Sequence, residues 1–389
     1  MERCESPQSD CFSFPRDVKI SYRHSLVLVS DYGHLRIQMF DLETRKYVNC
    51  IPLSHHPQCL ELDSNDLDSV VITLSYSHVC KFRMLDRNEI SLRWQIGVSN
   101  ESNHANEIID DEIHQDNPAE STNGNTLFYY PMGVTVLPKR NNFEPSDIYV
   151  CDSGHHRIQI INSLDGSFIR SISMTCEFSP LHHGMNIHSS IHEPWSIAIL
   201  QNNFASSSLN GEPQLIISEY WSSNLKILSR KLIPHNGHMG RVVERWEVKG
   251  RMSILLEEES SWTSMNPWTR HERTHQTSQQ QVQSQSQSQQ QQQHPDYFVC
   301  PMGLCVDRAS GNIIVSDSMN HRLLVFNSSK GEWMKSFGSF GLNPCKSSST
   351  RSGGINGEKM YAPFGMCVNE WTGELFVVDE NNHRVLIFE

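Results

Sequence analysis

The string VSDYGHLRIQMF, residues 29–40, decides how this chain folds, because it returns three times further along. The copies are VCDSGHHRIQII at residues 150–161, VSDSMNHRLLVF at 315–326 and VVDENNHRVLIF at 377–388. In each copy an Asp is followed five residues later by an Arg and then by an apolar run. Such recurrence is typical of proteins built from repeated structural units. The pairs are Asp31 and Arg36, Asp152 and Arg157, Asp317 and Arg322, and Asp379 and Arg384.

A proline stands 16 or 21 residues before each of these Asp residues, at positions 15, 131, 301 and 363. Two further prolines, Pro57 and Pro194, start weaker copies of the same pattern. The residues at the Asp and Arg positions are Thr73 and His78 in the first of these, and Glu219 and Asn224 in the second. The sequence therefore predicts six repeats.

Each repeat is predicted to contain four β-strands, named a to d. The positions three and five residues after every proline are apolar, as Val18 and Ile20 are after Pro15, which is typical of a strand with one face in a core. Strand b ends at the Asp, a tight turn follows, and strand c begins after the Arg. Strand d is expected near residues 47–51, 92–96, 168–174, 241–248 and 332–338. Four antiparallel strands in about forty residues predict a blade of a β-propeller.

The pattern Asp-x-x-Asn-His-Arg at residues 317–322 and 379–384, with Pro-x-Gly at 363–365, resembles the NHL-repeat family. The resemblance implies an all-β, six-bladed propeller of four-stranded antiparallel blades, forming a single domain. We expect the blades at about residues 15–54, 57–97, 131–175, 194–249, 301–338 and 363–389. The chain ends just after strand c of the last blade. Either residues 1–14 supply its outer strand, as the resemblance implies, or the sequence is part of a longer chain.

The four longest connections all join strand d of one repeat to strand a of the next, so we expect them on one face of the ring. Residues 97–128 form an acidic insertion, and residues 250–296 a Gln- and Ser-rich insertion that we expect to be disordered. The acidic residues before Asn125, which no Lys or Arg accompanies, are Glu101, Glu107, Asp110, Asp111, Glu112, Asp116 and Glu120.

The face that carries these connections is our candidate binding surface, since loops carry function on a scaffold that positions them. The alternative is that long polar loops are merely tolerated there. The candidate contact residues are Tyr32, His56, Tyr130, His192, Trp221 and Tyr361.

The sequence contains no pattern that predicts catalysis, and we expect no cofactor. The four Asp–Arg pairs belong to four blades and point in four directions, which no single active site needs. We therefore interpret the pairs as structural, with the Asp accepting N–H groups of its own turn. The resemblance also includes an enzymatic alternative. Amidating lyases that resemble this fold hold a metal with histidines from several blades. The entries to the repeats offer histidine in two blades, at His55, His56 and His192, where three imidazoles are normally needed. We therefore predict no metal site.

The net charge of −12 argues against DNA binding and against a basic membrane-surface protein. No apolar run approaches the length of a membrane-spanning helix, and the first residues contain no apolar signal segment. We expect a cytoplasmic monomer that does not bind membranes.

Three functions are compatible with these patterns. The favoured one is a protein-interaction scaffold or substrate-recognition module with protein partners of unknown identity. Similar propellers recognise substrates for ubiquitin ligases, but this chain has no RING-type zinc pattern, so any ligase link would act through a partner. The alternative is single-stranded RNA binding on the same face, by Tyr32, Tyr130 and Trp221 with basic residues of the fourth repeat. The acidic insertion counts against it, and a metal-dependent lyase ranks last. The basic residues are Lys226, Arg230, Lys231, Arg241, Arg245, Lys249 and Arg251.

Overall fold

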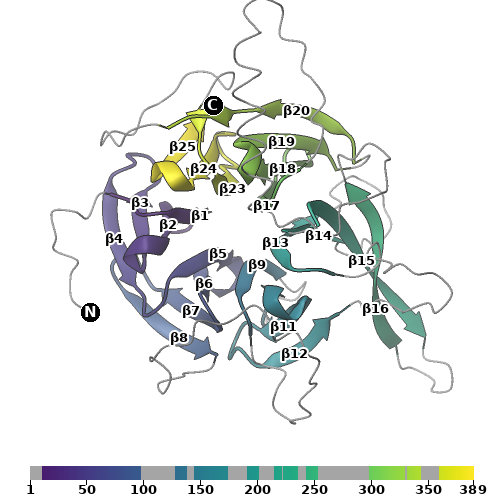
Figure 1. The fold of residues 1–389 in the computed structure, drawn as a ribbon. Helices are drawn as coiled ribbons and strands as arrows, with labels where there is room; N and C mark the ends of the chain where they lie inside the picture. Colours follow the sequence, from purple (N-terminus) through teal and green to yellow (C-terminus); the bar gives the residue numbers. More distant parts are fainter. Residues whose placement is uncertain are drawn as a thin grey trace, which may run out of the picture.

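Six small β-sheets stand around a central axis and form a ring (Figure 1). The computed structural model describes residues 11–97, 128–137, 144–173, 191–200, 214–220, 222–234, 242–252, 298–328, 331–342 and 359–389. The predicted all-β, six-bladed propeller is confirmed. In each blade strand a lies innermost and the following strands pair antiparallel outwards.

The inner strand of each of the first three blades begins at the predicted proline. Blade 1 contains β1 (Pro15–Ser21), β2 (Leu26–Asp31), β3 (Arg36–Asp41) and β4 (Tyr47–Pro52). Blade 2 contains β5 (Pro57–Asp63), β6 (Ser69–Leu74), β7 (His78–Met84) and β8 (Ile90–Ile96). Blade 3 contains β9 (Pro131–Leu137), β10 (Asp147–Asp152), β11 (Arg157–Asn162) and β12 (Phe168–Ile172).

The last three blades follow the same order. Blade 4 contains β13 (Pro194–Leu200), β14 (Gln214–Glu219), β15 (Asn224–Pro234) and β16 (Val242–Met252). Blade 5 contains β17 (Pro301–Val306), β18 (Asn312–Asp317), β19 (Arg322–Asn327) and β20 (Trp333–Phe337). Blade 6 contains β23 (Pro363–Val368), β24 (Leu375–Asp379) and β25 (Arg384–Phe388). A short parallel pair, β21 (Ser339–Phe340) and β22 (Lys359–Met360), lies between blades 5 and 6.

The apolar positions of the inner strands build a core that runs through all six blades. Val18, Val134 and Ile197 are among its buried members, and each lies three residues after the proline of its strand. A side chain of a strand points to the opposite face from its neighbours, so the positions two and four after each proline lie on the other face of the inner strand.

Each inner strand contains a bulge just after its proline, and in blades 1, 2, 4 and 5 a hydroxyl from strand b accepts a backbone N–H of the bulge. In blade 1 the ladder shifts between Pro15 and Val18, and the N–H of Asp17 donates to Oγ of Ser30 at 2.7 Å. The Ser30 hydroxyl in turn donates to the carbonyl of Gln58 in blade 2 at 3.0 Å. One hydroxyl thus repairs the bulge and joins two blades.

Blade 2 differs from the prediction in one position. Its strand-b partner of Pro57 is Leu74, not Thr73, and Leu74 pairs directly with His78. The hydroxyl of Thr73 takes the Ser30 role, accepting the N–H of Cys59 at 3.0 Å and donating to the carbonyl of Met132 at 2.6 Å. The turn of this blade is therefore one residue shorter than predicted.

The sixth blade closes against the first through side chains. Arg45 pairs with Glu374 at 2.8 Å, and the rings of Tyr22 and Trp371 lie 4.6 Å apart. The described part of the segment expected to supply the outer strand, residues 11–14, forms no strand and lies over the turn of blade 1, where the N–H of Gly33 donates to the Ser13 carbonyl at 2.7 Å. The remaining residues of that segment, 1–10, lie outside the described residues.

The two predicted insertions also lie almost wholly outside the described residues. The exceptions are Gly97 and Phe128 at the ends of the acidic insertion, and residues 250–252, which belong to β16 rather than to the Gln- and Ser-rich insertion. Within the described ranges no helix is long and apolar enough to cross a membrane.

Candidate functional site

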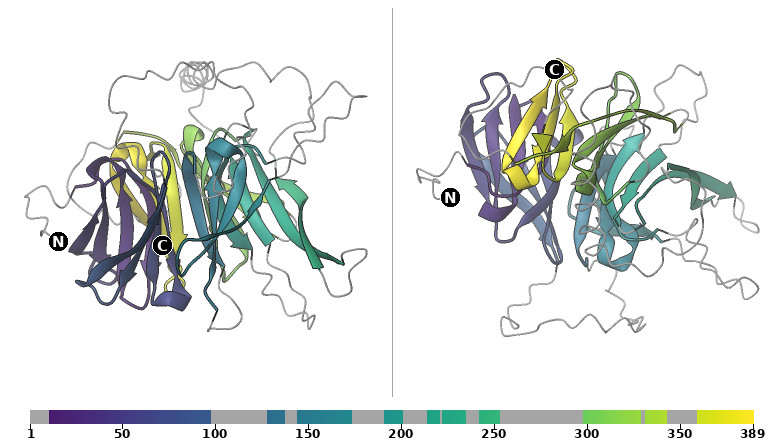
Figure 2. Two further views of the ribbon diagram at one scale, coloured as in Figure 1. Left: turned by 90° about the horizontal axis from the view of Figure 1, so that it is seen from below. Right: turned by 45° about the horizontal axis from the view of Figure 1, so that its top comes forward.

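The strands run between two faces of the ring (Figure 2). One face, called the loop face here, carries the turns from strand b to strand c and the entries to strand a. Backbone hydrogen bonds join turns and entries on this face, as in the bond from the N–H of Tyr130 to the carbonyl of Tyr76 at 2.8 Å. The five candidate contact residues that the structure describes lie on these turns and entries.

The repeated Asp residues hold the entries in place. In blade 1, Oδ1 of Asp31 accepts the N–H of Ser13, which lies two residues before the proline. The same bond recurs at 2.6–2.8 Å in four other blades, with Glu219 in place of Asp in blade 4: Tyr129 to Asp152, His192 to Glu219, Val299 to Asp317, and Tyr361 to Asp379. The expectation that Asp accepts N–H groups of its own turn is wrong, because the carboxylate faces the incoming chain and caps no turn N–H.

The second oxygen of each Asp is occupied by the repeat itself. The Nε of Arg36, Arg157, Arg322 and Arg384 lies 2.7–2.8 Å from the Asp of its own blade. The residue three after the Asp also donates to this oxygen at 2.9 Å, whether it is His34, His155, Asn320 or Asn382. Burial raises the pKa of Asp317 against the pull of Arg322. Both oxygens of these buried carboxylates are thus bound by the fold.

The repeated His residues clamp the next blade. Nδ1 of His156 accepts the N–H of Glu193 at 3.1 Å, Nδ1 of His321 accepts that of Ala362 at 3.1 Å, and Nδ1 of His383 accepts that of Phe14 at 2.9 Å. Each donor lies directly before a proline and has positive φ. The bond between His383 and Phe14 belongs to the junction of blades 6 and 1, so the ring is closed there by the same device.

Five of the six candidate contact residues lie next to aromatic or imidazole rings on the loop face. Tyr32 stacks on His56 with centroids 4.5 Å apart, and His192 stacks on His156 at 4.7 Å. Tyr130 lies 6.5 Å from Tyr76 and Tyr361 lies 5.3 Å from His321. These contacts stand at four different junctions between blades, so the residues surround the axis rather than meeting at one point. Trp221 lies outside the described residues.

Most of the basic residues proposed for RNA contact that the structure describes lie elsewhere. Lys226 is buried, and its Nζ lies 2.8 Å from Oε1 of Glu219, where it replaces the missing Arg of blade 4. Arg230, Lys231 and Arg245 lie along the outer pair β15 and β16, away from the turn at Asn224, whereas Arg251 is paired with Lys226 close to that turn.

Within the described residues, one group of three side chains has the composition of a metal site. Donor atoms of His156, His192 and Glu193 lie within 4.8 Å of one another, and burial raises the pKa of Glu193 to about 7. Nδ1 of His156, however, already accepts a backbone N–H, so the neutral ring carries its proton on Nε2. A metal on Nε2 would require the proton on Nδ1 and would break the clamp. The cluster is thus organised as a joint between blades.

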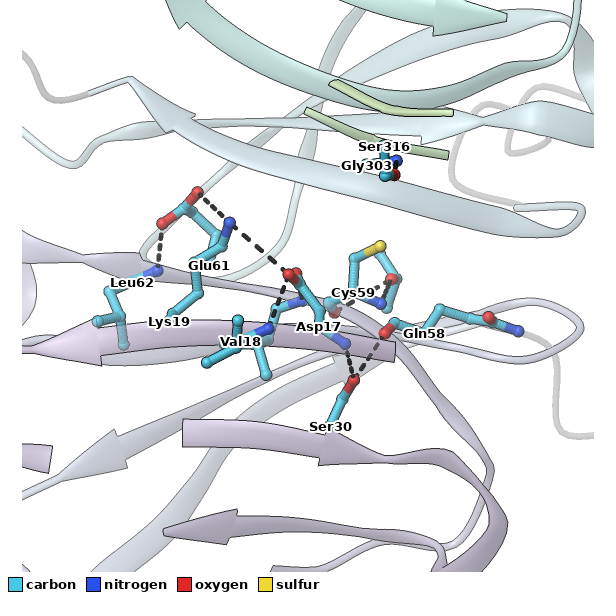
Figure 3. Close-up of polar contacts among 12 residues, drawn as sticks. Asp17, Val18, Lys19, Ser30, Gln58, Cys59, Glu61, Leu62, Gly303 and Ser316 are labelled. Atoms are coloured by element: carbon cyan, nitrogen blue, oxygen red, sulfur yellow. Dashed lines mark hydrogen bonds and ion pairs between the residues drawn. The ribbon is translucent and has the colours of Figure 1, made fainter. Parts of the chain in front are cut away.

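A charged cluster at the central axis was not predicted (Figure 3). Nζ of Lys19 lies 3.9 Å from Oδ1 of Asp17 and 3.8 Å from Oε2 of Glu61 in the neighbouring blade. Asp17 also accepts the N–H groups of Val18 and Leu60 at 2.9 and 3.0 Å. Burial raises the pKa of Asp17 to about 6, although Lys19 works in the opposite direction. The signal was charge at positions two and four after a proline, on an otherwise apolar strand.

The fold and these contacts define the class of the protein. It is a β-propeller whose blades are joined by a repeated Asp, His and Arg. The model of the NHL repeat matches residues 298–326 and 361–388, in blades 5 and 6. The Asp, His and Arg clamp of those two stretches recurs in blade 3, and blade 1 retains the Asp and Arg. The chain is therefore a β-propeller that contains NHL repeats, matched by the family model in blades 5 and 6.

Solved structures show the fold alone. A structural genomics protein of unknown function from Bacteroides thetaiotaomicron is 10% identical, with 96% of this chain and 69% of that one covered and a TM-score of 0.50. An auxiliary nutrient binding protein from the same organism is 10% identical, with 96% and 68% covered and a TM-score of 0.48. The Cps50 (Swd1) β-propeller domain of Myceliophteria thermophila is 8% identical, with 96% and 82% covered and a TM-score of 0.46. No curated protein matches the sequence.

Proposed function

We propose that the protein is an interaction scaffold that binds protein partners through its loop face. The observation that carries this proposal is the set of aromatic and imidazole side chains on that face, which include the exposed Tyr129 and Tyr130. Aromatic side chains are enriched where proteins bind one another, because they bury large areas at low entropic cost. The backbones beneath them are held by the Asp and His clamps, so the face is organised before a partner arrives.

The proposal assigns no catalytic role to the Asp–Arg pairs, whose polar atoms are occupied by the fold. The second candidate function, RNA binding, has less support from the described residues, because Lys226 is buried and paired with Glu219, and Lys231 and Arg245 lie in the part of β15 and β16 away from the turn at Asn224. A substrate-recognition role in ubiquitin ligation would need a separate catalytic partner.

The test is affinity capture of the intact chain from lysate, with and without ribonuclease, followed by mass spectrometry. A triple variant, Tyr32→Ala, Tyr130→Ala and Tyr361→Ala, is compared with Trp371→Ala, which removes a 68% exposed ring from the opposite face. Circular dichroism and thermal unfolding establish that both variants are folded. We expect the triple variant alone to lose the partners, and ribonuclease to leave them bound.

Equal capture by a folded triple variant would overturn the assignment of the loop face. Partners that disappear with ribonuclease would replace the proposal with RNA binding. Ubiquitin-pathway enzymes among the retained proteins would support the substrate-recognition role.

A further inference from the structure

Three tyrosines form an exposed patch on the loop face between blades 2 and 3. Tyr76, Tyr129 and Tyr130 have exposed fractions of 62%, 46% and 42%. The ring of Tyr130 lies 4.7 Å from that of Tyr129 and 6.5 Å from that of Tyr76, so the three rings are continuous. The name tyrosine patch is used for these three residues.

The patch is rigid at its base. The N–H of Tyr129 donates to Oδ1 of Asp152 at 2.7 Å, and the Tyr129 carbonyl accepts the N–H of Gly154 at 2.9 Å. A Cβ on Gly154 would collide with the Tyr129 ring, so glycine is required for this close approach. The N–H of Tyr130 donates to the Tyr76 carbonyl at 2.8 Å. Three exposed rings on a fixed backbone form a preorganised contact surface.

Elsewhere on the loop face the protein already places a cation on a tyrosine. The guanidinium of Arg16 lies 3.8 Å from the centre of the Tyr32 ring, and Glu380 holds its Nε at 3.0 Å. No such contact with a Lys or Arg is found at the tyrosine patch among the described residues. The ring faces of tyrosine attract cations, and most strongly where water is excluded.

The sequence that precedes the patch has the charge that favours a positively charged ligand. The chain leaves β8 at Gly97 and returns at Phe128, directly before Tyr129. The sequence between these points carries seven carboxylates and no Lys or Arg. A field of this sign attracts basic segments and repels the phosphates of a nucleic acid.

We propose that the tyrosine patch binds an arginine- or lysine-rich segment of a partner protein, with its cationic side chains on the tyrosine rings. This inference rests on the proposed function and names the class of partner for one part of the loop face. The aromatic surface supplies the short-range contacts, and the net negative charge of the chain favours a cationic partner.

The test measures binding of short fluorescein-labelled peptides to the full chain by fluorescence anisotropy. One peptide alternates glycine and arginine, and its control replaces each arginine with citrulline, which has nearly the same shape and no charge. An oligouridine RNA of similar length is the third probe. The variants are Tyr76→Ala with Tyr130→Ala, the matched Tyr76→Phe with Tyr130→Phe, and Trp371→Ala as a control on the opposite face.

We expect the arginine peptide to bind and the citrulline peptide and the RNA to bind at least tenfold more weakly. The double Ala variant should weaken arginine-peptide binding about tenfold, while the double Phe variant and Trp371→Ala stay within about twofold of the unchanged protein. Equal binding of the citrulline peptide, or unchanged binding by the folded double Ala variant, would overturn the inference. If the RNA binds more tightly than the arginine peptide, and the double Ala variant loses this binding, the patch is assigned to RNA instead.

These outcomes separate the inference from the proposed function. If partner capture depends on the loop face but the arginine peptide does not bind, the class of partner is wrong and the interaction face stands. If the peptide binds and no cellular partner depends on the face, the proposed function is wrong.

Discussion

At the scale of single residues, the repeated Asp and His act across the chain rather than within their own turn. Asp317 holds the N–H of Val299 and His321 holds that of Ala362, so the entries to two successive blades are fixed by one turn. The spacing of Asp and Arg predicted an ion pair, because both residues lie in one short stretch. It could not show the clamps, because their donors are distant in sequence and come close only in the ring.

The first prediction concerns Asp17 and the pH dependence of the free energy of unfolding. Its pKa is raised to about 6 in the folded protein, mainly by burial, against an ordinary value of 3.8. Since the folded state disfavours the ionised form, the contribution of Asp17 to the free energy of unfolding falls as pH rises from about 4 to 6 and levels off above. The full shift corresponds to roughly 2–3 kcal/mol.

Replacement of Asp17 by Asn removes this titration, although one oxygen that accepts the N–H of Val18 or Leu60 is lost. We expect the stability of Asp17→Asn relative to the unchanged protein to rise by roughly 2–3 kcal/mol between pH 4 and pH 7. Urea unfolding at several pH values measures the difference, in which the other titrating groups cancel. A difference that does not vary with pH would show that Asp17 titrates normally in the fold.

At the scale of elements, the strands could be predicted where the repeat is regular. Apolar residues three and five after each proline predicted the inner strands, and the Asp marked the end of strand b. The shorter turn at Leu74 was missed because the weak copy in blade 2 has no Asp to mark the position. The sequence pattern missed Asp17, Lys19 and Glu61 because it rested on the apolar positions. The contact of these charged residues depends on how the strands of neighbouring blades lie side by side, which the sequence does not show.

Glycine recurs two residues after the proline because the inner strands of neighbouring blades lie close together there. The second prediction concerns one of these glycines. A Cβ on Gly303 would collide with the carbonyl of Phe364 in the next blade, which is backbone and cannot move aside. We expect Gly303→Ala to lower the free energy of unfolding by about 2–3 kcal/mol through overpacking. Gly373→Ala is the comparison, because nothing lies within 4 Å of its Cβ and its cost comes only from a φ of 79°.

That comparison variant should lose about 1 kcal/mol, and both values follow from urea unfolding at one pH. Equal losses in the two variants would mean that contact between inner strands does not limit the spacing of the blades.

At the scale of the whole molecule, the number of blades followed from counting copies, whereas the way the ring closes did not. The expected outer strand from residues 1–14 rested on resemblance, and its described part instead lies on blade 1. The observed junction between blades 6 and 1 uses the same His clamp as two other junctions, with Phe14 as the donor. The loop face followed from strand order alone, since b to c turns and entries to strand a must emerge together.

Arg16 is the residue that ties this junction most directly, and it makes the last prediction. Its Nε lies 3.0 Å from Glu380 in blade 6, its Nη1 donates to Gln58 in blade 2, and its guanidinium covers Tyr32. The side chains of Arg16 and Glu380 are 20% and 12% exposed, and burial raises the pKa of Glu380 even with Arg16 beside it. Loss of Arg16 would therefore leave a desolvated carboxyl without its cation.

We expect Arg16→Ala to lower the free energy of unfolding by about 2–3 kcal/mol, and by less when Glu380→Gln is also present, with a coupling of about 1–2 kcal/mol in the double-mutant cycle. The matched control is Arg308 with Glu370, an ion pair of the same 3.0 Å length between blades 5 and 6 that is 64% and 43% exposed. Solvent screening should hold that coupling below about 0.5 kcal/mol. Equal coupling energies in the two cycles would contradict closure through Arg16. If Arg16 and Glu380 close the ring, their coupling must exceed that of the exposed pair Arg308 and Glu370, which joins two blades that are consecutive in the sequence.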